Sequence, residues 1–444
     1  MNVLKRMSLA GVVALGVILG GCSREPGTAS FSPDGGRLVF PWAKPAGKTG
    51  LAVSNADRSG FHVLPHTSKA QLPSWSPDGR RILFFRSREE EAPGKKSQTE
   101  INSLWCFDTV LDRAVIVADR VEAESAWSPD GRSLAVLGER RGRESLVIYD
   151  VWSLRRRRRI WLPRRLTAMN IEWLPGQQPR LLVLGWRQGG SIPGPEGDLY
   201  LVQGDRFHRL TDSGDVTTFS WDRRGLLVYA REPIALSMDG EHIRRAAALW
   251  CSLDLRTGAR KLLPLRMDLC HMLPGEREGW ARMCIAGPTG QTALILYSSG
   301  GDGTAAGIYR VDPHLKQVVL LKRLLPVGAA RQEPSSKATV VDSPPAGGLL
   351  LGMVWELAMP SWSADGRRLA VYEKGSARYQ TKRGEVDCDV RRLELFDDNG
   401  ARVIASDVPA ARTSVPGPAK IPRPRLRAPH GVPGMPPIAL RSEG

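Results

Sequence analysis

Short runs of apolar residues follow tight polar turns along most of this chain of 444 residues. The clearest pattern is an aromatic residue, then Ser-Pro-Asp-Gly or a variant of it, then a run such as Arg-Leu-Ala-Val. Proline presets φ for the first central position of a type I turn, and glycine accepts the left-handed conformation that follows. The short apolar run is typical of a strand. The pattern therefore predicts tight hairpins in five segments: 31–40, 75–84, 127–136, 221–229 and 362–371.

The spacing of the leading aromatic residues indicates a structural repeat. Phe31 and Trp75 are 44 positions apart, and Trp75 and Trp127 are 52 apart. Trp127 and Trp221 are 94 apart, or two units of 47, so a further copy is expected near Trp173. Periods of roughly 40–50 residues with four strands each are typical of propeller blades.

A second hairpin is predicted after each first one, because an apolar run leads into another polar turn. These runs lie at 51–57, 104–108, 146–150, 199–202, 249–254, 308–312 and 393–397. The predicted fold is therefore all-β: a β-propeller of seven four-stranded blades, within a range of six to eight.

Three regions depart from the repeat. The sixth copy has only a degenerate first turn at 287–290. Residues 327–360 form an insertion, for which an inserted hairpin and a partial eighth blade are both open. The strand that closes the last blade is expected from 401–410, since few residues precede the first copy.

The combined pattern resembles the repeat of TolB-type propellers, which are relatives of the WD-repeat propellers. The resemblance covers residues 31–406, and it is specific in four copies and looser in the rest. We interpret the tryptophans as packing between blades, with ligand stacking as the alternative. The other motif residues are interpreted as turn chemistry. The repeat residues are Pro33, Asp34, Gly35, Trp75, Pro77, Asp78, Gly79, Trp127, Pro129, Asp130, Gly131, Trp173, Trp221, Gly225, Trp362, Asp365 and Gly366.

The first residues have the pattern of an export signal. A basic start, 1–6, precedes an uncharged apolar segment, 8–21, which is too short to span a bilayer. The segment ends in Leu-Gly-Gly-Cys22, which resembles a bacterial lipoprotein cleavage box. The resemblance implies a signal peptide over 1–21, lipid on the Cys22 thiol and a linker over 22–30. A cleaved signal with an incidental cysteine is the alternative. We expect an exported protein held in the cell envelope by lipid, at the outer membrane facing the periplasm in a Gram-negative cell.

The remaining cysteines indicate neither a metal site nor a redox site, because no Cys-x-x-Cys pair is present. Cys106 and Cys251 occupy equivalent positions in two Leu-Trp-Cys runs and are predicted to be buried. A disulfide between Cys270 and Cys284 is left open. Cys388 is the last of the six cysteines in the sequence.

The chain is strongly basic, with a formal net charge of +17. Its densest basic segment comprises Arg155, Arg156, Arg157, Arg158 and Arg159. Two interpretations are open: a solvated hairpin on the propeller rim, or contact with anionic lipid, lipopolysaccharide phosphates or an acidic protein. Nucleic acid is not expected as a partner of an exported lipoprotein.

The composition changes after Ser406. Residues 407–444 are rich in proline and basic residues and have no strand pattern, so a disordered tail is predicted there. The tail either reaches a partner or has none.

Catalytic chemistry has little support in the sequence. The seven histidines are dispersed, and no His-Glu-x-x-His, Gly-x-Ser-x-Gly or phosphate-loop motif occurs. No catalytic residue, metal or cofactor is predicted. We expect a non-catalytic envelope scaffold that binds a protein or peptide and contacts the membrane through lipid on Cys22. The alternatives are an enzyme acting on an envelope glycan or peptide at the central channel, and a small-ligand sensor.

Overall fold

The computed structural model divides the chain into a compact unit, Met1–Val408, and a second unit, Pro409–Gly444. The predicted signal peptide, Cys22 and the predicted tail lie outside the residues that the structure describes. The described residues are 28–43, 49–91, 98–140, 142–174, 180–187, 197–221, 226–231, 234–236, 243–245, 248–267, 281–287, 291–297, 307–312, 317–323, 339–341, 349–382 and 384–406.

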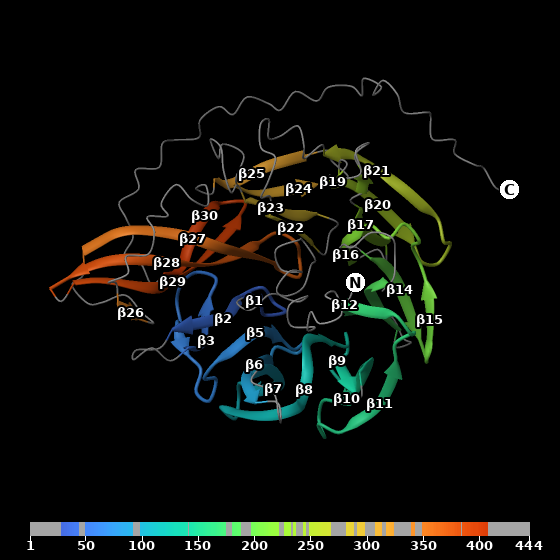
Figure 1. The fold of residues 1–444 in the computed structure, drawn as a ribbon, viewed down its shortest axis with the longest axis horizontal. Helices are drawn as coiled ribbons and strands as arrows, with labels where there is room; N and C mark the ends of the chain where they lie inside the picture. The colour runs from blue at the N-terminus through green and yellow to red at the C-terminus, as the bar shows by residue number, and fades with distance from the viewer. Residues whose placement is uncertain are drawn as a thin grey trace, which may run out of the picture. The chain divides into compact units, whose positions relative to one another are not determined.

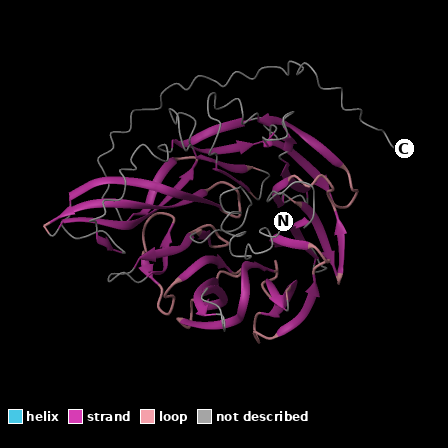
Figure 2. Ribbon diagram, in the orientation of Figure 1, coloured by secondary structure: helices cyan, strands magenta, loops and turns pink. Residues whose placement is uncertain are grey.

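Every regular element among the described residues is a β-strand (Figure 2). The first sheet has the order β1-β2-β3-β4, with bounds Ser30–Phe31, Arg37–Ala43, Thr49–Asn55 and His62–Val63. The second sheet has seven strands in antiparallel sequence order. They are β5 (Ala70–Trp75), β6 (Arg81–Glu91), β7 (Gln98–Asp108), β8 (Arg113–Trp127), β9 (Ser133–Arg140), β10 (Arg143–Asp150) and β11 (Arg156–Trp161).

Three four-stranded antiparallel sheets follow along the chain. The first of them comprises β12 (Leu166–Trp173), β13 (Arg180–Arg187), β14 (Asp198–Gln203) and β15 (Arg206–Arg209). The next comprises β16 (Val216–Trp221), β17 (Leu226–Arg231), β20 (Ala248–Asp254) and β21 (Arg260–Met267), with a separate hairpin of β18 (Ile234–Leu236) and β19 (Ile243–Arg245). The third comprises β22 (Ala281–Ala286), β23 (Thr292–Tyr297), β24 (Gly307–Asp312) and β25 (Gln317–Arg323).

The last sheet has five strands. They are β26 (Thr339–Val341), β27 (Leu349–Trp362), β28 (Leu369–Thr381), β29 (Gly384–Asp397) and β30 (Gly400–Ser406). β30 pairs with β29, so the outer strand of this sheet comes from the segment expected to close the last blade. Residues 349–355 form neither a separate hairpin nor a separate blade. They extend β27, which pairs with β28 from Leu349 to Trp362, while β26 lies parallel to β29.

The seven-stranded sheet consists of two four-stranded meanders that share one strand. The first part of β8 pairs with β7 as far as Val121, and its second part pairs with β9 from Val121 to Trp127. The described chain is thus built from antiparallel four-strand meanders in sequence order, which confirms the predicted all-β fold class. The count of seven separate blades stays a prediction.

The core lies between neighbouring sheets. Val39, Leu51 and Val53 of the first sheet pack against Trp75 and Phe84 of the second, and every one of these side chains is buried. Each buried side chain of this size contributes about 1.5–3 kcal/mol relative to exposure. Equivalent clusters join each later sheet described here to a neighbour. Packing between sheets, rather than within one, therefore supplies the core.

The first and last sheets also pack against each other, so the sheets follow one another around a centre (Figure 1). Phe31 and Phe40 share a buried cluster with Tyr372 and Leu393. The Arg368 guanidinium donates to the Gly35 carbonyl oxygen over 2.6 Å. Among the described strands, none of the first sheet enters the last, and side-chain packing and such contacts join the two sheets.

Candidate functional site

The Ser-Pro-Asp-Gly segments form turns that use their own polar groups. In the copy at 128–133, the Ser128 hydroxyl donates to Asp130 Oδ1 over 2.5 Å and accepts from the Ser133 amide over 2.8 Å. Gly131 has φ of 68°, in the left-handed region that favours glycine. The Ser128 hydroxyl and the Arg132 amide lower the pKa of Asp130. The same contacts recur at 32–37, 76–81 and 363–368, which contain the other Pro, Asp and Gly residues of the motif.

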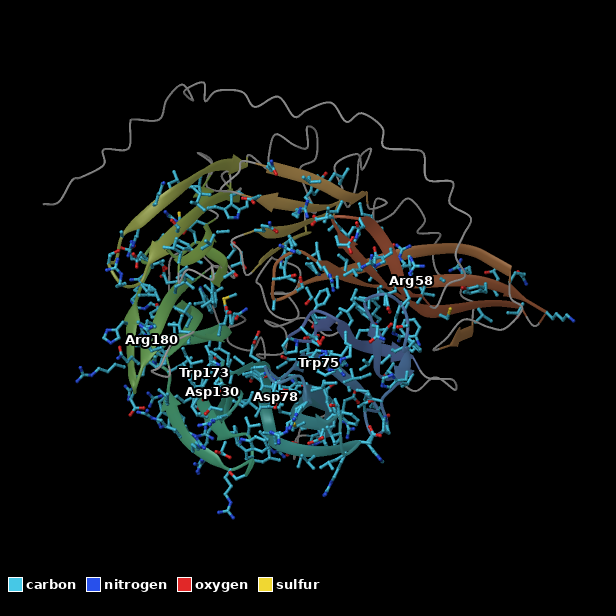
Figure 3. All side chains as sticks on the ribbon, turned by 180° about the vertical axis from the view of Figure 1, so that it is seen from behind. Arg58, Trp75, Asp78, Asp130, Trp173 and Arg180 are labelled. Atoms are coloured by element: carbon cyan, nitrogen blue, oxygen red, sulfur yellow. The ribbon has the colours of Figure 1, made fainter. Side chains whose placement is uncertain are left out.

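Successive turns lie side by side at one end of the strands. The Arg37 guanidinium donates to the Gly79 carbonyl oxygen over 3.4 Å. A methyl group added at Gly131 would lie 3.8 Å from the ring of Pro77. Figure 3 labels Asp78 and Asp130 on two such turns. Each of these carboxylates accepts hydrogen bonds from a serine hydroxyl and a backbone amide of its own turn. The two aspartates therefore stabilise the turns.

Where their side chains are described, the motif tryptophans lie against clusters of apolar side chains. Trp75 and Trp173 are buried among apolar residues of adjacent sheets, and Trp173 Nε1 donates to the Ala126 carbonyl oxygen over 3.0 Å. Trp127 and Trp362 are half-buried and pack against such clusters. The side chain of Trp221, and Gly225, lie outside the described residues.

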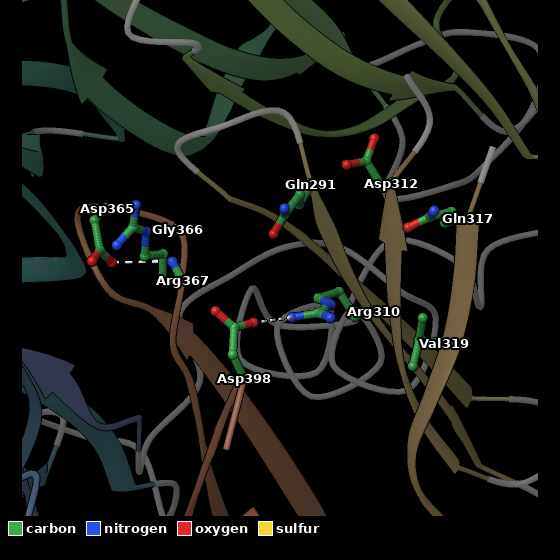
Figure 4. A pocket seen from close by; sticks show the side chains of 9 residues that line it. All are labelled: Gln291, Arg310, Asp312, Gln317, Val319, Asp365, Gly366, Arg367 and Asp398. Atoms are coloured by element: carbon green, nitrogen blue, oxygen red, sulfur yellow. Dashed lines mark hydrogen bonds and ion pairs between the residues drawn. The ribbon is translucent and has the colours of Figure 1, made fainter. Parts of the chain in front are cut away.

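A polar groove of about 350 Å³ lies between the β22–β25 sheet and the last sheet (Figure 4). It opens beside the degenerate sixth copy of the repeat, at the same end of the strands as the Ser-Ala-Asp-Gly turn. Its lining combines amides, carboxylates, guanidiniums and one exposed valine. The lining residues are Gln291, Arg310, Asp312, Gln317, Val319, Asp365, Gly366, Arg367 and Asp398.

Gln291 carries the feature of the groove that points to a ligand. Its Oε1 atom is buried from solvent and has no hydrogen-bond partner among the described residues. A buried acceptor without a donor costs about 1–3 kcal/mol. A ligand that brings an N–H or O–H group to this atom recovers that cost.

Carboxylates outnumber guanidiniums in the groove. Arg310 Nη1 lies 4.0 Å from Asp398 Oδ1, and the Arg367 amide donates to Asp365 Oδ1 over 3.0 Å. The Ser363 hydroxyl lowers the pKa of Asp365, which is therefore ionised at neutral pH. The groove thus favours a ligand that carries both hydrogen-bond donors and positive charge.

A second polar feature is a group of three glutamates, one each from β8, β9 and β10. Burial raises the pKa of Glu122, and repulsion from Glu139 raises it further. Burial also raises the pKa of Glu144, although its carboxylate accepts the Ala168 amide over 3.0 Å. The sequence reasoning missed the glutamate group, because strand pairing decides which carboxylates lie side by side, and it missed the groove, because the groove residues come from segments far apart in the chain. The degenerate sixth turn was the sequence signal nearest to the groove.

The arginine run lies on β11 and the turn before it. Arg157 forms an ion pair with Asp150, and Arg158 Nη2 lies 2.9 Å from an Asp205 carboxylate oxygen. The Arg159 guanidinium donates to the Ser145 hydroxyl over 2.7 Å. Arg155 and Arg156 are exposed. The run is therefore divided between contacts to neighbouring strands and charge that faces solvent.

The cysteine side chains that the structure describes are buried. Cys106 and Cys251 are free and buried, and their burial was predicted; Cys388 is buried as well. Burial raises the pKa of Cys106 to about 12. The Cys270–Cys284 pair and Cys22 concern residues or side chains outside the described set. Within the described residues, no group of three or more His, Cys, Asp or Glu side chains is placed to hold a metal ion. The described part of the chain also contains no helix long and apolar enough to cross a membrane.

Comparisons with known proteins show likeness in fold alone. No model of a protein family matches the chain, and no curated protein matches it in sequence. The β-propeller domain of the Trilobed protease from Pyrococcus furiosus is 12% identical, with a TM-score of 0.49, over 87% of this chain and 96% of that one. Oligogalacturonate lyase from Vibrio parahaemolyticus is 11% identical, with a TM-score of 0.50, over 80% of this chain and 87% of that one.

TolB from Acinetobacter baumannii is also among the similar structures. It is 13% identical, with a TM-score of 0.38, and the match covers 64% of this chain and 63% of TolB. The antiparallel four-strand meanders, with the first sheet packed against the last, define the class of the protein, which is a β-propeller. A fold by itself does not select a function.

Proposed function

We propose that this chain is a lipid-anchored envelope propeller of the TolB type that binds an extended basic peptide segment in the polar groove, without catalysis. The observation that supports this function is the buried Gln291 Oε1 atom in the groove. An extended peptide presents backbone N–H groups at regular spacing, and one of them satisfies this acceptor. Asp312, Asp365 and Asp398 supply the negative charge that a lysine or arginine side chain requires.

The test uses fluorescently labelled octapeptides of glycine and serine with two lysines, beside matched peptides with two glutamates. We expect the lysine peptides to bind the full chain more tightly. Gln291→Leu and Asp398→Asn should each weaken that binding about tenfold, the effect of losing roughly 1.4 kcal/mol. Gln380→Leu is the matched control, because Gln380 lies outside the lining of the groove and its side-chain amide donates to the carbonyl oxygen of its neighbour Thr381. Equal binding of both peptide sets, or no effect of either groove variant, contradicts the proposal.

The lipid anchor rests on the sequence of the first 22 residues. In the source cell or a bacterial host, Cys22→Ser should abolish incorporation of labelled fatty acid and move the protein out of the membrane fraction. Ser23→Ala is the control, and it should keep both properties. Retention of label by Cys22→Ser shows that Cys22 is not the modified residue.

An enzyme is the second candidate, and the raised pKa values of Glu122 and Glu144 favour it. A raised carboxyl pKa favours the protonated form that general acid catalysis requires. Incubation with envelope oligosaccharides and peptides, followed by mass spectrometry, tests this function. Glu122→Gln should then remove activity, while the exposed control Glu89→Gln keeps it. Absence of any product, or full activity of Glu122→Gln, eliminates this candidate.

A further inference from the structure

Two neighbouring turns hold large apolar side chains out in solvent. Val110 and Leu111, in the turn between β7 and β8, are 74% and 71% exposed. Trp152, in the turn between β10 and β11, is 66% exposed. These are the three most exposed large apolar side chains among the described residues. Such a concentration of exposed apolar surface marks an interaction site rather than ordinary surface variation.

The turn structure does not require apolar residues at these positions. Asp108 Oδ1 accepts the amides of Val110 and Leu111 over 2.9 and 3.1 Å, and Asp150 Oδ1 accepts the Trp152 amide over 3.0 Å. Asp254 makes the same turn between β20 and β21, where it accepts the amide of a polar residue, Arg256, over 2.8 Å. Val110 and Trp152 therefore have a role other than turn formation.

The two turns belong to one continuous surface. The amide and hydroxyl of Thr109 both donate to the Arg80 carbonyl oxygen, over 2.9 and 2.8 Å. The next residue, Arg81, places its guanidinium carbon 4.2 Å from the centroid of the Trp152 ring. Arg80 and Arg81 thus bridge the turn that carries Leu111 and the turn that carries Trp152.

Exposed arginines surround the apolar side chains. Arg80, Arg113, Arg155 and Arg156 are exposed, and Arg81 covers one face of Trp152. The carboxylates nearby include Asp78, Asp108, Asp112 and Asp150, and of these Asp108 and Asp150 accept amides within the turns. The arginines outnumber the carboxylates, so the surface carries net positive charge. We call Val110, Leu111, Trp152 and these five arginines the docking surface.

We propose that the docking surface binds a bilayer that contains anionic phospholipid. Apolar side chains at the tips of two turns can enter the interfacial region, while the arginines beside them contact lipid phosphates. Tryptophan is suited to this region because its ring is apolar and its N–H is polar. An acidic protein is the less favoured partner, since the apolar groups protrude from turns into solvent. The inference does not depend on the ligand of the polar groove.

The test measures sedimentation of the full chain with vesicles of phosphatidylcholine containing 30% phosphatidylglycerol, beside vesicles of phosphatidylcholine alone. All proteins carry Cys22→Ser, so that no lipid is attached and any contribution of the N-terminal segment is common to all. We expect tighter binding to the anionic vesicles. Val110→Ser with Leu111→Ser, and separately Trp152→Ser, should weaken it about tenfold, and Arg155→Gln with Arg156→Gln should reduce its dependence on salt.

Leu262→Ser is the matched control, because Leu262 is 60% exposed on β21 of another sheet. It should bind as the parent does. Thermal unfolding of each variant, at the parental temperature, shows that the fold is kept. If the apolar variants bind anionic vesicles as tightly as the parent or as Leu262→Ser, the bilayer proposal is wrong. Loss of capture of an acidic protein together with unchanged vesicle binding assigns the surface to such a protein, and it overturns the proposal equally.

Discussion

At the scale of single residues, the aspartates of the repeat act through the turn they close. Asp130 accepts the Ser128 hydroxyl and the Arg132 amide, over 2.5 and 3.0 Å. We expect Asp130→Ala to lower the free energy of unfolding by about 1–2 kcal/mol, since two hydrogen bonds are lost. Asp205→Ala, at an exposed ion pair with Arg158, should cost less than about 1 kcal/mol. Urea unfolding of the three proteins measures the difference.

The lowered pKa of Asp130 predicts that the free energy of unfolding depends on pH. Because the folded-state pKa of Asp130 is lowered, its contribution to stability is present above the unfolded value of about 3.9 and is lost as pH falls through the folded value. The stability difference between wild type and Asp130→Ala should therefore shrink below about pH 4. A difference that stays constant into strong acid would show that the carboxylate charge has no part in the turn.

The pKa of Glu122 is shifted upward in the folded state, so its effect on the pH dependence of stability is opposite to that of Asp130. Burial and Glu139 raise its folded-state pKa, so the folded state binds the extra proton, and stability falls as pH rises from about 4.3 through the raised value. Glu122→Gln should be more stable than wild type at pH 7 and lose that advantage at pH 4. Unfolding at both pH values, with exposed Glu89→Gln as the control, measures this. A stability difference between Glu122→Gln and wild type that is the same at both pH values would show that burial does not destabilise the charged form of Glu122.

At the scale of elements, the terminal strand β30 contributes to stability both by pairing and by burial of an apolar side chain. β30 covers the edge of β29, and its Ile404 is 8% exposed in the cluster that joins the first and last sheets. A chain that ends at Asn399 loses this buried side chain and the strand pairing. We expect it to unfold at least about 2 kcal/mol more easily than a chain that ends at Ser406. Amide exchange along β29 should rise in the shorter chain alone. Equal protection in both chains would mean that β30 is dispensable.

The hairpins could be predicted from the sequence, but the full extent and pairing of some strands could not. The hairpins were predictable because turn residues and alternating apolar runs are local signals. The length of β27 and the sharing of β8 between two meanders were not, since both depend on which strand lies alongside. Leu349–Trp355 reads as a separate apolar run, yet pairing with the far part of β28 makes it one strand with Trp362.

At the scale of the whole molecule, closure between the first and last sheets rests on a small set of residues. Phe31 is 8% exposed and packs in the cluster that contains Tyr372 and Leu395. Phe31→Ala should cost about 3 kcal/mol and raise amide exchange in both β2 and β28. Phe61→Ala, at a 44% exposed site just before β4, should have a smaller effect on both, since its ring contacts Phe40 and Trp42 of β2 but stays partly in solvent. A loss of protection in β2 alone would show that the two sheets do not stabilise each other.

The sequence by itself determined the turns, the four-strand repeat and the all-β propeller class, because each rests on residues a few positions apart. Only the tertiary structure decided which groups share a site. Gln291, Arg310 and Asp398 meet in the polar groove, although more than 100 positions separate the first from the last. Arg81 meets Trp152 on the docking surface in the same way. Packing of adjacent sheets creates these juxtapositions, and no local pattern encodes them.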